Sequence, residues 1–444
     1  MGQGKLNRKA SVLFIWNKDI RHPDAGGGTI EFFAIMKSLV AKGFRVTQVS
    51  GNFSGSKVHE TIEGVNIIRM GQLYTMPFFL WKAQMTDHFL DRFDVIVEGL
   101  GYVSLLLPLI TRKPVLVVCQ HLPKEIFSIE GPQALGKPLG YVLPPIARIV
   151  ESAIMPAVYK RVPVFTFSES TKRDLVETGI PEENVFVFPN ALAGMTMRND
   201  PLVSGGFTPS AAISKRTTPT IICVGRLRKY KGVQDLIRAM PRVKQEFPGV
   251  TLFIVGKGEY EPQLKQLSHS LDLDQNIVFS GYVDVSEKFD LIASSNLLVM
   301  PSYREGFATP VFEAQMCGTV PIVSDAIGVG SLVEHGRTGL IFHRGDSQEL
   351  AKQIIGSLRD SSLMENMRLN LMKLSRTTDW QRNGQVFLDN FEEKLTQAYL
   401  SSIGGSSGAS VPSPWNRRSA VLWRQSRIGF PLLCEYLDTS SRTE

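Results

Sequence analysis

The chain of 444 residues is long enough for about two or three domains. Its content of 43% apolar and 20% charged residues is typical of a globular protein and excludes a disordered or fibrous one. A formal net charge of +7 favours anionic partners, such as phosphorylated substrates or acidic membrane surfaces. Nucleic acid is not an expected partner, because no lysine- or arginine-rich tract is interleaved with aromatic residues.

Cysteine usage and hydropathy indicate the compartment. The four cysteines are widely spread, without a C-x-x-C pair or a zinc-like His/Cys spacing, which fits a reducing, cytoplasmic environment. No uncharged apolar stretch reaches the ~20 residues of a spanning helix, and the apolar run at 11–16 is too short for a signal peptide. Apolar and basic residues at 124–160 leave two options open, a peripheral contact with the inner face of a membrane or an ordinary cover of the sheet.

Strands and helices are expected to alternate along both halves of the chain. In the first half, 11–16 predicts a strand, 29–42 a helix that Gly43 ends, and 44–49 the next strand. Further first-half strands are expected at 65–69, 95–98, 115–119, 164–167 and 185–188. The second half predicts strands at 220–224, 251–255, 277–279, 297–300 and 321–324, and helices at 233–240 and 386–400. This alternation predicts an α/β protein with two doubly wound, Rossmann-like domains facing a cleft.

Composition also suggests the boundaries between the domains. A stretch rich in Pro, Gly, Ser and Thr reads as a linker, and a second such stretch begins near the carboxyl end. We expect a first domain at 1–198, a linker at 199–218, a second domain at 219–378, a last amphipathic helix within 379–400, and a flexible tail at 401–444.

The segment 302–313 holds the strongest candidate site. It follows the expected strand 297–300 and leads into a helix, with Thr309 as the expected cap and Pro310 at the first helical position. Ligands of open α/β sheets bind at the carboxyl ends of strands, and helix amino ends suit phosphate. Glu305 and Glu313 flank this turn and can accept hydrogen bonds from sugar or ribose hydroxyls. Either glutamate alone could instead be an ordinary solvated charge.

Cations and glycines complete the candidate site. Arg226 and Lys231 follow the expected strand 220–224 and could together neutralise a diphosphate without a metal. The glycines at 26–28 follow the first strand, and they could either approach a phosphate or let a helix pack closely on the sheet. His121 follows the expected strand 115–119. A lone histidine is more often structural, but the carboxyl end of a strand is a position that strengthens the case for a functional one, so both readings stay open.

Taken together, these motifs resemble the GT-B glycosyltransferases of family four, the large retaining family also called glycosyl transferases group 1. The resemblance covers about residues 11–398. Its strongest segments are Gly225-Arg226-Leu227-x-x-x-Lys231-Gly232, Val255-Gly256-x-Gly258, 301–314 with Glu305 and Glu313 separated by seven residues, and Gly336-x-Thr338-Gly339-Leu340. Weaker matches are Pro23-x-Ala25-Gly26-Gly27 and Ser168-Glu169-Ser170-Thr171-Lys172.

The resemblance implies a role for each matching residue. Arg226 and Lys231 would bind the donor diphosphate and stabilise the leaving group, Glu305 would contact the transferred sugar, and Glu313 would bind the ribose. His121 would lie on the sugar or acceptor side, which makes the implied catalytic set Arg226, Lys231, Glu305 and His121. The implied donor-binding residues are Gly26, Gly27, Arg226, Lys231, Gly256, Glu305, Gly306, Phe307, Ala308, Thr309 and Glu313, where 307–309 would act through backbone N–H groups.

The resemblance also implies an activity. It predicts a retaining hexosyl- or glycosyltransferase that moves a sugar from a nucleotide-diphosphate donor to a hydroxyl of a glycan, glycolipid or natural product. No cofactor or essential metal is expected, and the last helix would return from the donor domain to the acceptor-side first domain. The alternatives are a non-catalytic GT-B-like scaffold, or another GT-B reaction such as epimerisation or phosphorolysis. The chain departs from the family at Thr29, where glutamate is common, and at Ala308, where glycine is common.

Overall fold

The computed structural model describes residues 10–403 except 24, 73–74, 101–103, 121, 123–144, 146–148, 189–215, 217, 306–307, 328–332 and 378–379. The chain divides into two compact units, Met1–Ser402 and Ile403–Glu444. The expected start of the flexible tail at residue 401 was wrong, because helix α15 (Trp380–Ile403) continues through residues 401–403. Residues 404–444 lie outside the described residues, so the fold described here is that of the first unit.

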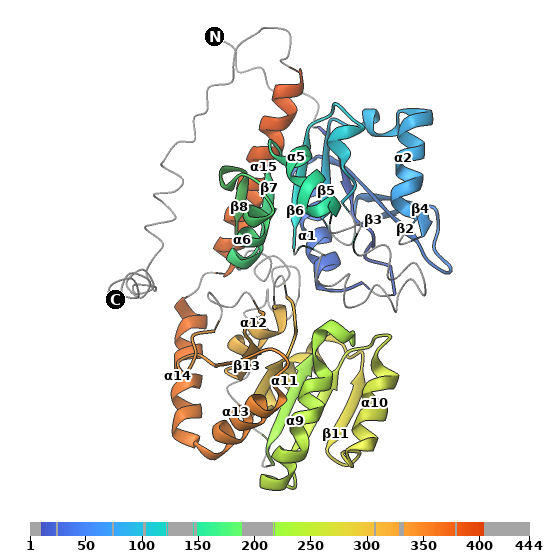
Figure 1. Ribbon diagram of the computed structural model, residues 1–444. Helices are drawn as coiled ribbons and strands as arrows, with labels where there is room; N and C mark the ends of the chain where they lie inside the picture. The colour runs from blue at the N-terminus through green and yellow to red at the C-terminus, as the bar shows by residue number, and fades with distance from the viewer. Residues whose placement is uncertain are drawn as a thin grey trace, which may run out of the picture. The chain divides into compact units, whose positions relative to one another are not determined.

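The first half of the chain builds an eight-stranded sheet in the order β3-β4-β2-β1-β5-β6-β7-β8 (Figure 1). Its strands are β1 Ser11–Ile15, β2 Arg45–Asn52, β3 His59–Ile62, β4 Val65–Gln72, β5 Val95–Leu100, β6 Val115–Cys119, β7 Val164–Thr166 and β8 Val185–Val187. All neighbours are parallel except β3 and β4, which are antiparallel. The edge strand β3 was not predicted, because none of its four residues is buried and its sequence forms no apolar run.

Helices cover both faces of this sheet. One core joins alternate strand residues such as Phe14 to α1 (Gly27–Ala41) and to α15 (Trp380–Ile403), where Phe391 is fully buried. Phe391 contacts Phe14 and Phe165 with ring centroids 6.3 Å and 5.0 Å apart. A second core lies on the opposite face. Its helices are α2 Met76–Asp87, α5 Met155–Tyr159 and α6 Glu169–Glu177.

The second half builds a six-stranded, fully parallel sheet in the order β11-β10-β9-β12-β13-β14. Its strands are β9 Thr220–Val224, β10 Thr251–Val255, β11 Ile277–Gly281, β12 Leu297–Met300, β13 Val320–Ser324 and β14 Leu340–Phe342. Its helices are α9 Val233–Glu246, α10 Glu261–Ser270, α11 Val285–Ser294, α12 Thr309–Met316, α13 Ser347–Arg359 and α14 Ser361–Thr377.

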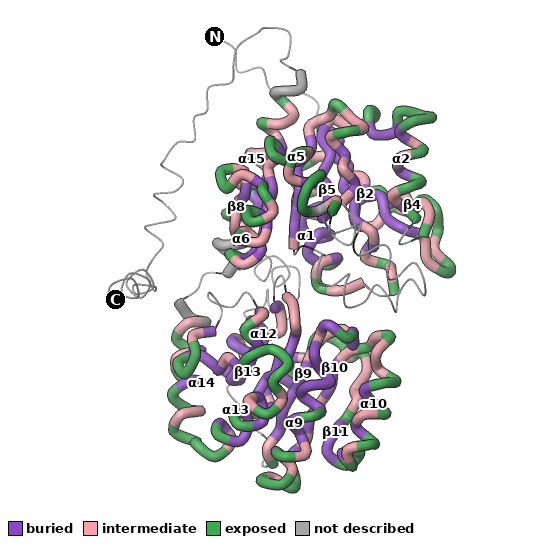
Figure 2. The backbone as a smooth tube through the Cα atoms, viewed as in Figure 1, coloured by how far each residue is buried: buried purple, intermediate pink, exposed green. Residues whose placement is uncertain are grey.

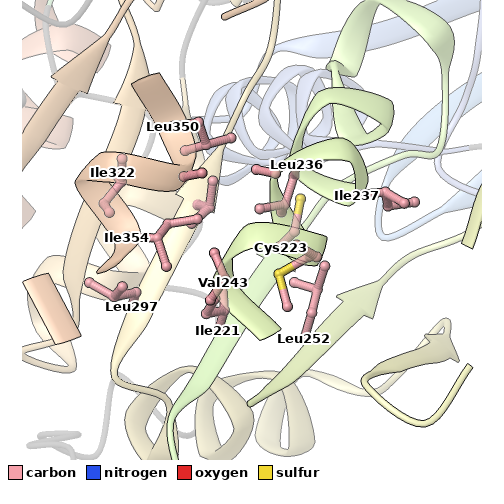
Figure 3. Packing of buried hydrophobic residues seen from close by; sticks show 14 of the residues in the cluster. Ile221, Cys223, Leu236, Ile237, Val243, Leu252, Leu297, Ile322, Leu350 and Ile354 are labelled. Carbon is pink, nitrogen blue, oxygen red and sulfur yellow. The ribbon is translucent and has the colours of Figure 1, made fainter. Parts of the chain in front are cut away.

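Successive strand residues point to opposite faces of the sheet, so each strand contributes side chains to two cores, one on each face. Ile221 and Cys223 pack with α9, α10, α13 and α14, as Figure 3 shows around Leu236 and Ile354. Ile222 packs on the other face with α11 and α12. Both faces of the central strands are therefore covered, and Figure 2 shows the tube of β9 mostly in the colour of buried residues. The predicted α/β class with two helix-covered, mostly parallel sheets is confirmed.

Two local expectations were wrong. Helix α9 does not end at Met240 but runs through Pro241 to Glu246, because Val243 on its next turn is fully buried in the core. Helix α12 begins at Thr309 itself, and Ala308 takes the cap position without any side-chain hydrogen bond. Pro310 lies in the first turn, as predicted. Among the described helices, none has the length and apolarity needed to cross a membrane.

Candidate active site

The candidate site begins where two adjacent central strands, β9 and β12, end. A Cβ on Gly256, where φ is +132°, would lie 1.9 Å from the carbonyl oxygen of Gly225. Only glycine allows such close contact between the segments that follow β9 and β10. Backbone bonds join the two segments, from Gly225 N to Val255 O at 2.9 Å and from Leu227 N to Lys257 O at 3.0 Å. The motif glycine at 256 thus fixes the turn that carries Arg226.

The structure brings Lys231 and Glu305 together. Lys231 Nζ lies 2.5 Å from Glu305 Oε1, and the two side chains are only 16% and 9% exposed. The hydroxyl of Ser302 donates to the same carboxylate oxygen at 3.0 Å. Burial disfavours the charge of Lys231, but the adjacent Glu305 carboxylate outweighs that effect and raises the pKa of Lys231. The site therefore holds a fixed positive charge bonded to a fixed acid.

Arg226 lies between this ion pair and the start of α1. The positive charge of its guanidinium opposes part of the rise in the pKa of Lys231, which shows that the two cations are neighbours. Its Nε lies 3.2 Å from the position that a Cβ of Gly26 would occupy, so the absence of a side chain at Gly26 lets Arg226 approach the backbone. Gly26 is the cap residue of α1, with extended backbone and no side-chain hydrogen bond to the helix end. The sequence-predicted glycines and the predicted cation thus meet.

The start of α12 faces the start of α1. A Cβ on Gly27 would lie 3.8 Å from the hydroxyl oxygen of Thr309. Neither helix has a side-chain cap at its amino end. Two uncapped helix amino ends and a guanidinium therefore converge, which is an arrangement suited to an anion.

Glu313 has a partner that sequence reasoning missed. Lys288 of α11 places its Nζ 2.5 Å from Glu313 Oε1, and Glu313 is buried in α12. A carboxylate has about four lone-pair positions, so Glu313 can accept further bonds from hydroxyl groups while Lys288 holds it. No sequence motif pointed to Lys288, which lies on a different helix 25 residues earlier.

Glu31 and Gln120 were also missed. Gln120 Nε2 donates to Glu31 Oε2 at 2.8 Å, and the Thr309 hydroxyl lies 3.5 Å from Glu31 Oε1. Burial raises the pKa of Glu31 to about 8, with the Thr309 bond opposing the shift and Glu305 adding to it. Thr29, where the resemblance expected glutamate, instead accepts a bond from the indole of Trp16 at 3.3 Å. The absence of the expected glutamate at position 29 was the sequence signal that could have directed attention to another acid nearby, Glu31.

Three predicted site residues, His121, Gly306 and Phe307, lie outside the described residues, and their roles stay predictions. The predicted backbone contacts of Ala308 and Thr309 with a donor, and the predicted donor contact of Gly256, stay predictions too. In the described ranges, no group of three or more His, Cys, Asp or Glu side chains could hold a metal ion.

Comparisons with known proteins identify the class. Residues 209–373 match the family model "Glycosyl transferases group 1". Glycogen synthase of Mycobacterium tuberculosis is 27% identical over 348 residues, which is 74% of this chain and 81% of the relative. The structure of HepE from Anabaena superposes with a TM-score of 0.60 at 18% identity, covering 86% of this chain and 100% of that one.

The protein is a GT-B glycosyltransferase. A second relative is 34% identical over 151 residues, or 32% of this chain and 39% of its own length. It is a GDP-mannose-dependent monoacylated alpha-(1-6)-phosphatidylinositol monomannoside mannosyltransferase of Corynebacterium glutamicum. The predicted family resemblance and enzyme class are confirmed. The matched residues of this GT-B enzyme include all six strands of the second sheet.

Proposed function

We propose that this glycosyltransferase moves a sugar from a nucleotide-diphosphate donor to an acceptor hydroxyl, with retention of anomeric configuration. The observation that carries the proposal is the Lys231–Glu305 ion pair, with Arg226 beside it and against the backbone of Gly26. Two cations and two uncapped helix amino ends suit a diphosphate, while an acid bonded to one of the cations suits the hydroxyls of the attached sugar.

Charge accounts for the chemistry of the leaving group. Negative charge grows on the diphosphate as its bond to the sugar breaks, and Arg226 and Lys231 would stabilise that charge most strongly in the transition state. These two positive charges are the reason for proposing that no metal cofactor is required. Glu305, held by Lys231 and Ser302, would orient the transferred sugar, and Glu313, held by Lys288, would accept bonds from the ribose.

The relatives narrow the donor and acceptor only to classes. HepE was crystallised with UDP-glucose, whereas the Corynebacterium glutamicum relative is named as GDP-mannose-dependent. Both nucleotides belong in the first donor screen. Glycogen is a glycan and a phosphatidylinositol mannoside is a glycolipid, so both acceptor classes belong in it as well. We propose residues 1–198 as the acceptor side and 219–378 as the donor side, in a cytoplasmic enzyme that contacts a membrane peripherally.

A donor screen with matched variants tests this function. Purified protein is incubated with UDP-, GDP- and ADP-sugars, and release of the nucleoside diphosphate is measured with glycan and glycolipid acceptors. We expect Arg226→Ala and Glu305→Gln each to lower the rate by about 10²–10³-fold, as loss of one preorganised charge does elsewhere. Arg359→Ala is the control, because Arg359 is an exposed cation of α13 that pairs with Glu246. Full activity of the Arg226 variant would reject the site assignment.

A further inference from the structure

Glu31 is a buried acid that the proposed function does not yet use. It lies in the second turn of α1, and its residue surface is only 4% exposed. Its Oε1 lies 3.8 Å from the position that a Cβ of Gly27 would occupy, so the carboxyl folds back toward the first turn of its own helix. That turn is also the part of α1 that Arg226 approaches, at Gly26.

The surroundings of Glu31 favour its uncharged form. Its two hydrogen-bond partners, the Gln120 amide and the Thr309 hydroxyl, are neutral. In the described part of the chain, the charged group that acts on it is Glu305, which is itself bonded to Lys231, while Arg226 lies against Gly26 at the cap of the same helix. Burial, with a further contribution from Glu305, raises the pKa of Glu31 to about 8, so the carboxyl carries a proton at neutral pH.

The side chain of Gln120 is held between Glu31 and the backbone of Gly28. A Cβ on Gly28 would lie 2.1 Å from Gln120 Oε1, so the amide occupies the space that a side chain at 28 would need. The backbone carbonyl of Gln120 accepts a bond from the Thr171 hydroxyl at 3.1 Å, which anchors the residue at the carboxyl end of β6. Because the amide N–H donates to Glu31 Oε2, the proton of Glu31 is available on the Oε1 side, toward the helix amino ends.

We propose that Glu31 presents a protonated carboxyl to the diphosphate of the donor and donates a hydrogen bond to one of its oxygens. The inference rests on the proposed function, since it names a further contact of the same donor. A neutral acid adds a hydrogen-bond donor beside Arg226 without adding a negative charge. The ionised form would instead place a second carboxylate, besides Glu305, next to an anion, and would repel it. Donor binding by this enzyme is therefore gated by the proton on Glu31.

The test is nucleotide affinity as a function of pH. UDP, GDP and ADP are titrated by calorimetry into the full chain at pH 7, 8 and 9, for the wild type and for Glu31→Gln. The protonated fraction of an acid that titrates at about 8 falls from about nine-tenths at pH 7 to about one-tenth at pH 9. We expect Kd of the wild type to rise about tenfold over that range. Glutamine keeps a neutral donor, so the variant should bind at pH 7 as the wild type does and change less than about twofold by pH 9.

Glu98→Gln is the matched control. Glu98 is likewise buried, and burial raises its pKa to about 7, but it accepts its hydrogen bonds from the Tyr159 hydroxyl and the backbone N–H of Leu105. This variant should keep the tenfold alkaline weakening of the wild type. Ionisation of the nucleotide itself affects all three proteins equally, so the differences between them isolate Glu31.

The outcomes separate this inference from the proposed function. A wild type that binds none of the nucleoside diphosphates contradicts the proposed function. A wild type that binds them with a pH dependence that Glu31→Gln shares overturns only the role of Glu31. If Glu31→Gln does not fold, Thr309→Val decides the matter, because it removes the bond that lowers the pKa of Glu31. The alkaline weakening should then move to higher pH, and an unchanged or lower midpoint would overturn the inference.

Discussion

Removing one partner of the Lys231–Glu305 pair should destabilise the enzyme, and removing both should restore part of the loss. The ammonium and carboxylate are 2.5 Å apart and mostly buried. Two unit charges at that separation attract by about 7 kcal/mol at an effective dielectric constant of about 20, and desolvation offsets much of this. Lys231→Met leaves Glu305 buried without its cation, a change that costs about 3–5 kcal/mol in fully buried pairs. We expect the low end, about 3 kcal/mol, because Arg226 remains nearby and Ser302 still donates to Glu305.

The assay is a double-mutant cycle of Lys231→Met, Glu305→Gln and the combined variant, followed by thermal unfolding at neutral pH. A loss of about 3 kcal/mol lowers Tm by about 6–12 °C at about 2–4 °C per kcal/mol. In the double variant no unpaired charge remains, so about half of the loss should return, which makes the coupling energy about 1.5 kcal/mol or more. Transferase activity should not return with stability. A Tm drop under about 2 °C for Lys231→Met, or strictly additive losses, would refute the reasoning.

Three further predictions concern packing and titration. Gly256→Ala should disrupt the segment that carries Arg226, because its Cβ would meet the Gly225 carbonyl at 1.9 Å, and nucleotide binding measured by calorimetry should fall with Tm. Phe391→Ala should lower the free energy of unfolding measured in urea by about 3–5 kcal/mol, since the ring is fully buried in the core that α15 shares with the first sheet. Faster proteolysis at α15 in this variant would support the prediction. The pKa of Glu98 is about 7 in the folded protein against an ordinary 4.5, so its contribution to the stability of the wild type should be lost as the pH rises from 4.5 to 7. Glu98→Gln should not show this loss when Tm is measured at pH 4.5, 6 and 8.

The sequence was informative where a structural feature depends on a few residues that are neighbours in the chain. Apolar runs located the parallel strands, since a strand buried on both faces must be apolar at nearly every position. Gly256 and Gly26 carried signals because close backbone approach excludes any other side chain at those positions. Edge strand β3 gave no such signal, because a strand that is only partly covered needs no apolar run.

By itself, the sequence determined the α/β class, the motif residues and the expectation that Arg226, Lys231 and Glu305 act together. Only the tertiary structure decided which partner each charge takes, Lys231 with Glu305 and Lys288 with Glu313. It also decided that Glu31 is held by Gln120, which lies 89 residues further along the chain, directly after strand β6. The physical reason is that burial and pairing set the charge of a side chain, and both are fixed by residues that are distant in sequence and adjacent only after folding.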